Sequence, residues 1–261
     1  MSSGGVRIGV IGAGFLAETR ARCWREVPGA ELVAVASATA DRARSFAKRF
    51  GIASVHEDAQ ALIGSREIDA VDLCVPNAVH RPLAEAAAAA GKHVICTKPL
   101  TAYVGQDLPP EADDEQVGSR DREQMARVAE AEGQAMLEAA ERAGVLLCYG
   151  ENWLYAPAFA RAEALLAEAG GPLLEMRGWE AHSGSHSPYA KAWRHTGGGA
   201  LLRLGSHPVG AMLHLKRVEG QRRLGRPIRV TEVSAEVADL TRTEGFDAAA
   251  SALASGWQDV E

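Results

Sequence analysis

The feature that most constrains this chain is the glycine-rich turn GAGFLA at residues 12–17. It follows an apolar run at residues 6–11 and precedes an apolar pattern of helical period over residues 17–24. In this setting the first glycine permits a tight turn, the second lets the backbone approach a pyrophosphate, and the small last residue lets helix and strand pack closely. The turn predicts a dinucleotide site formed by Gly12, Gly14, Phe15 and Leu16.

Strand-like and helix-like patterns alternate through the first 150 residues. Apolar runs at residues 6–11, 32–37, 54–55, 70–75, 93–96 and 145–149 predict strands, and residues 17–24, 43–50, 79–90 and 125–139 have helical periodicity. Strands that are apolar throughout are typical of a parallel sheet covered on both faces. We therefore expect an α/β fold in which residues 1–150 form a Rossmann domain with a doubly wound parallel sheet.

The end of the second strand bears on the choice of cofactor. Domains that bind NAD usually carry an acid there, which accepts hydrogen bonds from the ribose 2′-OH. This chain has no acid at that point, whereas Ser37, Thr39 and Arg42 suit a 2′-phosphate. We expect NADP, with NAD as the alternative, and Arg42 fits a solvated helix residue equally well.

The pattern changes after residue 150, so residues 151–261 are expected to form a second α/β domain. Helices are predicted at residues 159–168 and 200–216, and strands at 172–182 and 228–240, with a Gly/Ser/His/Pro loop in between. Residues 103–120 hold prolines, glycines and several acids, which predicts a solvated loop. A role of this loop at the active site or at a subunit contact is the alternative.

Composition excludes several classes of function. The net charge of −6 gives no reason to expect a nucleic-acid partner, and no apolar run is long enough to cross a bilayer. The N-terminus lacks a signal-peptide pattern, so we expect a cytoplasmic protein. The four cysteines form no CxxC pair and are expected to be free thiols. Because His182 and His186 have only Glu180 near them, we expect no metal site.

Four stretches in order resemble the Gfo/Idh/MocA family of oxidoreductases, which includes glucose–fructose oxidoreductase and inositol dehydrogenase. They are GVIGAGFLAETRARCW at residues 9–24, IDAVDLCVPNAVH at 68–80, AAAAAGKHVICTKPL at 86–100, and WRHTGGGALLRLGSH at 193–207. The resemblance implies a second domain with a large, mostly antiparallel sheet, a substrate site between the domains, and a homo-oligomer formed through that sheet. It also implies that Pro76, Asn77 and His80 line the cofactor channel, that Lys98 is the active-site lysine, and that His207 is the active-site histidine.

The chemistry of these residue types agrees with the implied roles. Hydride transfer from an alcohol carbon requires a group that takes the hydroxyl proton. A lysine at the carboxyl end of a parallel strand, as predicted for Lys98, points toward the crevice where such sheets bind ligands. Histidine accepts or relays protons near neutral pH, as expected of His207. The later loop offers the substrate candidates Tyr189, Lys191, Trp193 and Arg194. Further candidates at the domain junction are Glu151, Asn152, Trp153 and Tyr155, each of which could equally be a hinge or core residue.

The chain departs from the family pattern in three places. Thr97 replaces the glutamate before Lys98, and a threonine can still bond a ribose hydroxyl. Arg203 replaces the aspartate four residues before His207, and in a helix the two would share a face. We expect either that the substrate carries a carboxylate or that Arg203 orients a hydroxyl. Family members continue beyond the length of this chain, so the second domain is expected to be incomplete.

These observations predict an NAD(P)-dependent dehydrogenase or reductase that acts on a small-molecule substrate, namely a sugar, cyclitol or sugar acid. One alternative is an NAD-dependent glycosidase or lyase of the same family, which would show no net change in cofactor absorbance. The other is a dinucleotide-binding protein without turnover, which the charge reversal at Arg203 favours.

Overall fold

The computed structural model describes residues 5–181 and 192–236 and divides the chain into two compact units. The first unit contains the residues up to Thr101 together with Arg122–Gly150. The second contains Ala102–Asp121 and the residues from Glu151 onward. The chain therefore passes between the units three times, and residues 102–121 belong with the second unit although they lie inside the first in sequence.

The first unit is built on a six-stranded parallel sheet with the order β3-β2-β1-β4-β5-β6. The predicted strands are confirmed, with small shifts at their ends: β1 (Val6–Ile11), β2 (Ala30–Ala36), β3 (Ser54–Val55), β4 (Ala70–Leu73), β5 (His93–Thr97) and β6 (Leu147–Gly150). The chain order reverses at β1, which lies between β2 and β4. Ligands bind at such a reversal point, outside the carboxyl ends of the strands.

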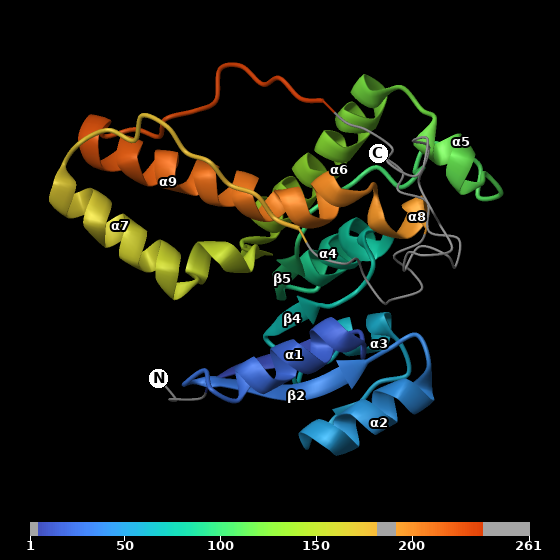
Figure 1. Cartoon of the computed structure of the whole chain (residues 1–261). Helices are drawn as coiled ribbons and strands as arrows, with labels where there is room; N and C mark the ends of the chain where they lie inside the picture. Colours follow the sequence, from blue (N-terminus) through green and yellow to red (C-terminus); the bar gives the residue numbers. More distant parts are fainter. Residues whose placement is uncertain (1–4, 182–191, 237–261) are drawn as a thin grey trace, which may run out of the picture. The chain divides into compact units, whose positions relative to one another are not determined.

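Helices fill the crossovers between these strands. The predicted helices are confirmed as α1 (Phe15–Trp24), α2 (Ala40–Phe50), α4 (His80–Ala89) and α6 (Arg122–Ala143), while the short elements α3 (Ala59–Ile63) and η1 (Asn77–Val79) had no clear pattern. Figure 1 shows α1 and α2 beside β2.

Two apolar clusters cover the two faces of the sheet. Side chains alternate between the faces along a strand, so neighbouring residues such as Val10 and Ile11 belong to different clusters. Val10 packs with Phe46 of α2, whereas Ile11 packs with Leu62 and Met136 on the opposite face. The doubly wound prediction for this unit is therefore correct.

The second unit is helical in its described part. Its elements are α5 (Asp114–Gly118), η2 (Asn152–Tyr155), α7 (Pro157–Ala169), α8 (Trp193–Thr196), the π-helical segment η4 (Leu201–Gly205) and α9 (Ser206–Leu224). In Figure 1, α7 and α9 lie side by side, and the Glu163 carboxylate on α7 is 2.6 Å from His214 Nε2 on α9. The predicted helices at 159–168 and 200–216 correspond to α7 and to η4 with α9.

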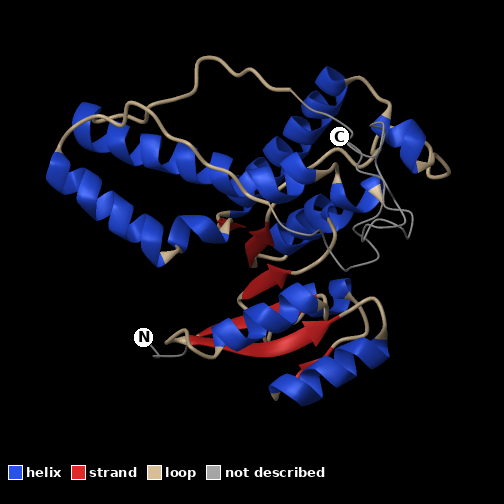
Figure 2. Cartoon of the chain, in the orientation of Figure 1, coloured by secondary structure: helices blue, strands red, loops and turns tan. Residues whose placement is uncertain are grey.

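The prediction of strands in the second half is wrong for the described residues. Residues 171–181 and 225–236 have no regular structure, and Figure 2 shows no strand in the described part of this unit. A strand needs a partner for its backbone groups, and here side chains of α9 serve instead. Lys216 Nζ bonds the Leu173 carbonyl at 3.0 Å, and Glu219 accepts from the Leu173 amide. The end of the second predicted strand, residues 237–240, lies outside the described residues, and so do Tyr189 and Lys191.

The prediction of a solvated loop at residues 103–120 is correct for exposed stretches such as 109–111 but wrong for the apolar residues of the segment. Tyr103, Val104 and Val117 are buried, with 3%, 6% and 0% of their surfaces exposed. Reciprocal hydrogen bonds between Asp113 and Gln116 form a capping box that starts α5. The prolines and acids indicated a loop, but they conceal a short apolar set that packs into the second unit.

Candidate functional site

The GAGFLA turn joins β1 to α1 at the point where the strand order reverses. Gly12 has φ = +111°, and a Cβ placed there would lie 2.2 Å from the Cys74 carbonyl oxygen on the neighbouring strand segment. Only glycine fits this backbone and this close approach. Gly14, the N-cap residue of α1, has nothing within 4 Å of its ideal Cβ position. The turn thus brings bare backbone to an open space at the first turn of α1.

A buried ion pair fixes α1 against the sheet. The fully buried Asp72 on β4 accepts from Arg20 Nε at 2.7 Å and from Trp24 Nε1 at 2.8 Å. Both donors belong to α1, so the helix is anchored through its second and third turns. Phe15 and Leu16 at the start of the helix remain outside the core, and Phe15 is 86% exposed.

The turn fits a dinucleotide pyrophosphate. The first amides of a helix have no intrahelical acceptor and stand at the positive end of the helix dipole, so they bind phosphate oxygens. No side chain caps α1, because its N-cap residue is Gly14. The open space beside Gly14 gives phosphate oxygens direct access to these amides.

The predicted adenosine-side residues surround the end of β2. Thr39 is the N-cap residue of α2, and its side chain makes no capping hydrogen bond. Arg42 is exposed, and no ion pair within the described ranges engages it. The neighbouring Asp41 pairs with Arg44 instead, at 2.6 Å. Ser37 lies half-buried just after β2. These groups are available to a ligand at the carboxyl end of the sheet.

The predicted nicotinamide-side residues follow β4 and β5. Pro76 is exposed and Asn77 half-buried after β4, while Thr97 ends β5 and Lys98 follows it, both half-buried. Because β4 and β5 are parallel neighbours, their carboxyl ends meet at the same edge of the sheet. The structure therefore brings these four residues to the edge that also carries the GAGFLA turn.

His80 requires a correction. Its side chain is fully buried, with Nδ1 3.1 Å from the Leu100 carbonyl oxygen and Nε2 3.0 Å from the Val75 carbonyl oxygen. Burial lowers the pKa of His80, although its contacts with backbone carbonyls oppose that shift. We therefore assign His80 to holding the segments after β4 and β5 together, rather than to direct contact with a cofactor.

In the second unit, His207 on α9 lies in a cluster with Glu151 and Trp153. His207 Nδ1 is 2.6 Å from Glu151 Oε1, and the same oxygen accepts from the Trp153 amide at 2.9 Å. The Trp153 ring stacks on the imidazole, with centroids 5.3 Å apart and planes 11° apart. The glutamate is fully buried and His207 is 8% exposed. No pattern in the sequence pairs Glu151 with His207, because 56 residues separate them.

Trp193 and Arg194 also require correction. Trp193 is 4% exposed and donates from Nε1 to the Tyr103 carbonyl oxygen at 3.0 Å. Arg194 Nε donates to the Ala112 carbonyl at 2.7 Å, and its Nη2 donates to the Pro109 carbonyl at 3.0 Å. Both side chains hold residues 102–121 in place, so the structure gives them packing roles instead of substrate contacts.

The remaining predicted substrate residues have different surroundings. Asn152 is exposed and Tyr155 is 77% exposed, both within η2, so their side chains are available to a ligand. Arg203 lies in the π-helical segment η4. This segment ends directly before α9, on which His207 follows Arg203 by four residues. Such segments are frequent at functional sites.

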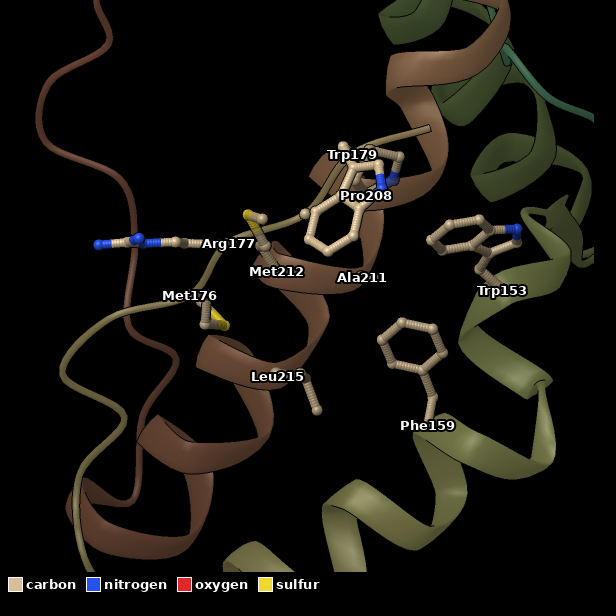
Figure 3. A pocket seen from close by; sticks show the side chains of 10 residues that line it. Trp153, Phe159, Met176, Arg177, Trp179, Pro208, Ala211, Met212 and Leu215 are labelled. Atoms are coloured by element: carbon tan, nitrogen blue, oxygen red, sulfur yellow. The ribbon is translucent and has the colours of Figure 1, made fainter. Parts of the chain in front are cut away.

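A pocket of about 310 Å³ in the second unit lies beside the His207 cluster. Figure 3 shows Trp153 and Phe159 on one side, with Met212 and Trp179 across from them. Trp153 thus contacts both the pocket and the imidazole of His207. The other lining residues are Met176, Arg177, Gly178, Pro208, Ala211 and Leu215.

The described residues hold neither a candidate metal-ion cluster nor a candidate membrane-spanning helix. No group of three or more His, Cys, Asp or Glu side chains in residues 5–181 and 192–236 is arranged to hold a metal ion. Among the same residues, no helix combines the length and apolar character that crossing a membrane requires.

The first unit is similar to the cofactor-binding domain of a known family of oxidoreductases. Residues 6–110 match the family described as "Oxidoreductase family, NAD-binding Rossmann fold" (GFO_IDH_MocA). The first unit therefore contains a Rossmann domain that matches the NAD-binding domain of the Gfo/Idh/MocA oxidoreductases, and this match supports the resemblance carried by the four motifs.

Three relatives illustrate the similarity. D-apiose dehydrogenase of Paraburkholderia graminis is 33% identical over 149 residues, which are 57% of this chain and 33% of the relative. Levoglucosan dehydrogenase of Pseudarthrobacter phenanthrenivorans is 28% identical over 218 residues, 78% of this chain and 49% of the relative. A dTDP-3,4-didehydro-2,6-dideoxy-alpha-D-glucose 3-reductase of Actinomadura kijaniata is 32% identical over 211 residues, 79% of this chain and 54% of the relative.

Solved structures show the same fold. A levoglucosan dehydrogenase in complex with NADH and levoglucosan matches with a TM-score of 0.64 and 24% identity, over 81% of this chain and 54% of that chain. GenD2 from gentamicin A biosynthesis, in complex with NAD, matches with a TM-score of 0.63 and 24% identity, again over 81% and 54%. The chain thus spans between a third and about half of the length of these relatives.

Proposed function

We propose that the first unit binds a nicotinamide dinucleotide, and that the protein transfers a hydride between this cofactor and a carbon of a sugar, cyclitol or sugar acid. The observation that carries the proposal is the GAGFLA turn at the carboxyl edge of the sheet, with Gly12 pressed against the Cys74 carbonyl and Gly14 facing open space. Relatives named as sugar and inositol dehydrogenases support the substrate class.

We assign the phosphates to the first turn of α1 and the nicotinamide side to the ends of β4 and β5. When bound, the nicotinamide supplies the hydride acceptor or donor. Lys98 stands just after β5, at the edge where the sheet would receive the substrate carbon, and is assigned to taking the hydroxyl proton. His207 is assigned to accepting or relaying that proton, and Asn152, Tyr155 and Arg203 to contacting the substrate.

We further propose that the cofactor is NADP. The end of β2 offers the Thr39 hydroxyl and the Arg42 guanidinium, and neither side chain is committed to a capping bond or an ion pair within the described ranges. A guanidinium binds a phosphate more strongly than it binds a ribose hydroxyl. The Arg42→Ala variant should weaken NADP binding by about tenfold and leave NAD binding within about twofold.

Arg203 favours a substrate that carries a carboxylate. Its guanidinium is suited to bidentate contact with a planar anion. Replacement of Arg203 by Ala should therefore reduce turnover of sugar acids more than turnover of neutral sugars. Equal losses on both classes would contradict this part of the proposal.

The test of the proposed function is calorimetric titration of the chain with NAD and NADP, followed by an absorbance assay with sugars, polyols and sugar acids. Gly14→Ala is the informative variant, because its Cβ has room in the protein alone but occupies the space assigned to the pyrophosphate. We expect unchanged thermal stability and at least about tenfold weaker nucleotide binding. Absence of binding by the wild-type chain, or unchanged affinity in the variant, would contradict the proposal. Binding without turnover on any substrate would leave a dinucleotide-binding protein.

A further inference from the structure

The cluster of His207, Glu151 and Trp153 contains a carboxylate that stability alone does not explain. Glu151 is fully buried, and only one of its two oxygens is bonded, since Oε2 has no hydrogen-bond partner among the described residues. A buried carboxylate with an unsatisfied oxygen costs free energy, and a buried ion pair is seldom more stabilising than apolar side chains of the same volume. The arrangement therefore points to a task performed by Oε1.

Several contacts fix Oε1 in place. It accepts from the Trp153 amide, which belongs to η2, and from His207 Nδ1 on α9. A Cβ on Gly210 would lie 3.3 Å from Glu151 Cγ, so the absence of a side chain there makes room for the glutamate against α9. The stacked Trp153 ring restricts rotation of the imidazole about its own axis. Contacts other than their mutual hydrogen bond therefore hold the carboxylate and the imidazole in position: the Trp153 amide and the space at Gly210 position the carboxylate, and the Trp153 ring positions the imidazole.

This geometry sets which nitrogen of His207 carries the proton. The carboxylate accepts only, so the nitrogen that faces it must donate, and Nδ1 holds the hydrogen in the neutral imidazole. Nε2 then presents its lone pair, and no hydrogen bond within residues 5–181 and 192–236 engages that nitrogen. The bare nitrogen is the one that can accept a proton from another molecule.

We propose that Glu151 is a positioning residue that keeps the proton of His207 on Nδ1, so that Nε2 serves as proton acceptor in the reaction. This inference rests on the proposed function. A bound nicotinamide would accept the hydride from the substrate carbon, and the hydroxyl oxygen would lose its proton as the carbonyl forms. That proton ends on Nε2, and the resulting imidazolium carries one positive charge opposite the Glu151 carboxylate. In the reverse direction Nε2 returns the proton.

The second His–Glu pair of the same helix provides a matched control. His214 Nε2 lies 2.6 Å from Glu163 Oε1, the same separation as in the first pair, but the opposite ring nitrogen is used. Its glutamate side chain is 28% exposed, whereas that of Glu151 is fully buried. A substitution of Glu163 removes the contact with His214, which is comparable and also involves α9, and it leaves the cluster of His207, Glu151 and Trp153 intact.

The experiment is nitrogen NMR of the whole chain labelled in its histidine rings, in which the His207→Asn variant identifies the His207 signals. Wild type should show the neutral ring protonated on Nδ1. Glu151→Met keeps the length of the side chain and removes the acceptor, so the Nε2-protonated form should become the major tautomer. Glu151→Gln should keep the original tautomer, because the Trp153 amide needs an acceptor at the Oε1 position. Glu163→Met should leave His207 unchanged.

Turnover supplies the second readout. In the Met variant kcat should fall at least about tenfold while KM stays within about twofold, and Gln should recover most of the loss. The proposal is overturned if wild-type His207 carries its proton on Nε2, if the Met variant keeps the wild-type tautomer, or if the tautomer changes without loss of kcat. Because NMR does not require nucleotide binding, failure of the proposed function is seen separately in the wild-type titration.

Discussion

The two units of this chain bury their apolar residues in different ways. In the first unit, both faces of the sheet are covered, and Leu62, Val71 and Leu73 are fully buried. In the second unit, α7 and α9 pack against each other, while Leu174 and Trp179 beside them are 91% and 82% exposed. An open sheet that is covered by helices on both faces buries its own apolar side chains, whereas two helices that pack mainly against each other leave apolar neighbours exposed.

The largest expected effect on the stability of the first unit comes from a substitution of Gly12. Alanine there would place Cβ 2.2 Å from the Cys74 carbonyl oxygen at φ = +111°, so both strain and a backbone clash oppose folding. We expect Gly12→Ala to lower the free energy of unfolding of the first unit by about 4 kcal/mol or more, measured by urea denaturation. Gly14→Ala is the control, with a change below about 1 kcal/mol. Similar stabilities of the two variants would refute the close packing at β1 and β4.

A matched pair of leucines compares the two units directly. Leu62 in the first unit is fully buried, at 0% exposure, whereas Leu174 in the second unit is 91% exposed. Leu62→Ala should cost about 3 kcal/mol, because it opens a cavity in a closed core. Leu174→Ala should change stability by less than about 0.5 kcal/mol. A large loss from Leu174→Ala in urea denaturation would mean that this residue is covered in solution.

An intermediate effect is expected at Trp193, which is well packed in the second unit. Trp193→Phe keeps most of the ring and removes the Nε1 donor, so the buried Tyr103 carbonyl loses its partner. We expect a loss of about 1–2 kcal/mol and faster proteolysis within residues 102–121. Unchanged proteolysis would show that this tryptophan does not hold the segment.

The smallest effect concerns the surface pair of Arg7 and Asp69, 2.7 Å apart in the first unit. The hydrogen bond from Arg7 lowers the pKa of Asp69 from 3.8 to about 2. Because the folded pKa is depressed, the pair stabilises the fold above about pH 4, and this contribution is lost as the pH falls toward 2. The carboxylate is 40% exposed, so we expect Asp69→Asn to cost only about 0.5 kcal/mol at pH 7. A difference from wild type that persists at pH 2 would exclude the ion pair as its source.

The sequence predicted the first unit well because its signals are local. The apolar run at residues 6–11 predicts a strand and forms β1. The positive φ of Gly12 in the GAGFLA turn is likewise a property of the local backbone. Family resemblance then predicted Lys98 and His207 as site residues, and this stays a prediction.

The sequence failed where long-range contacts decide. Trp193 and Arg194 were expected to contact substrate, because aromatic and cationic side chains suit sugars, but partners 80 to 90 residues earlier use them for packing. The strand predictions in the second unit failed because alternation specifies a strand only where a neighbouring strand exists. Glu151 was predicted as a substrate, hinge or core residue but not as the partner of His207, because their contact spans 56 residues.

The threefold passage of the chain between the units has a practical consequence for anyone who dissects the protein. A fragment that ends at Gly150 would carry residues 102–121 without Trp193 and Arg194, and would expose Tyr103 and Val117 to water. After a single protease cut behind Gly150, the hydrogen bonds of Trp193 and Arg194 to residues 102–121 would still hold the two pieces together. The cofactor unit is therefore not separable by truncation alone, and excising it cleanly would require replacing residues 102–121 with a short bridge.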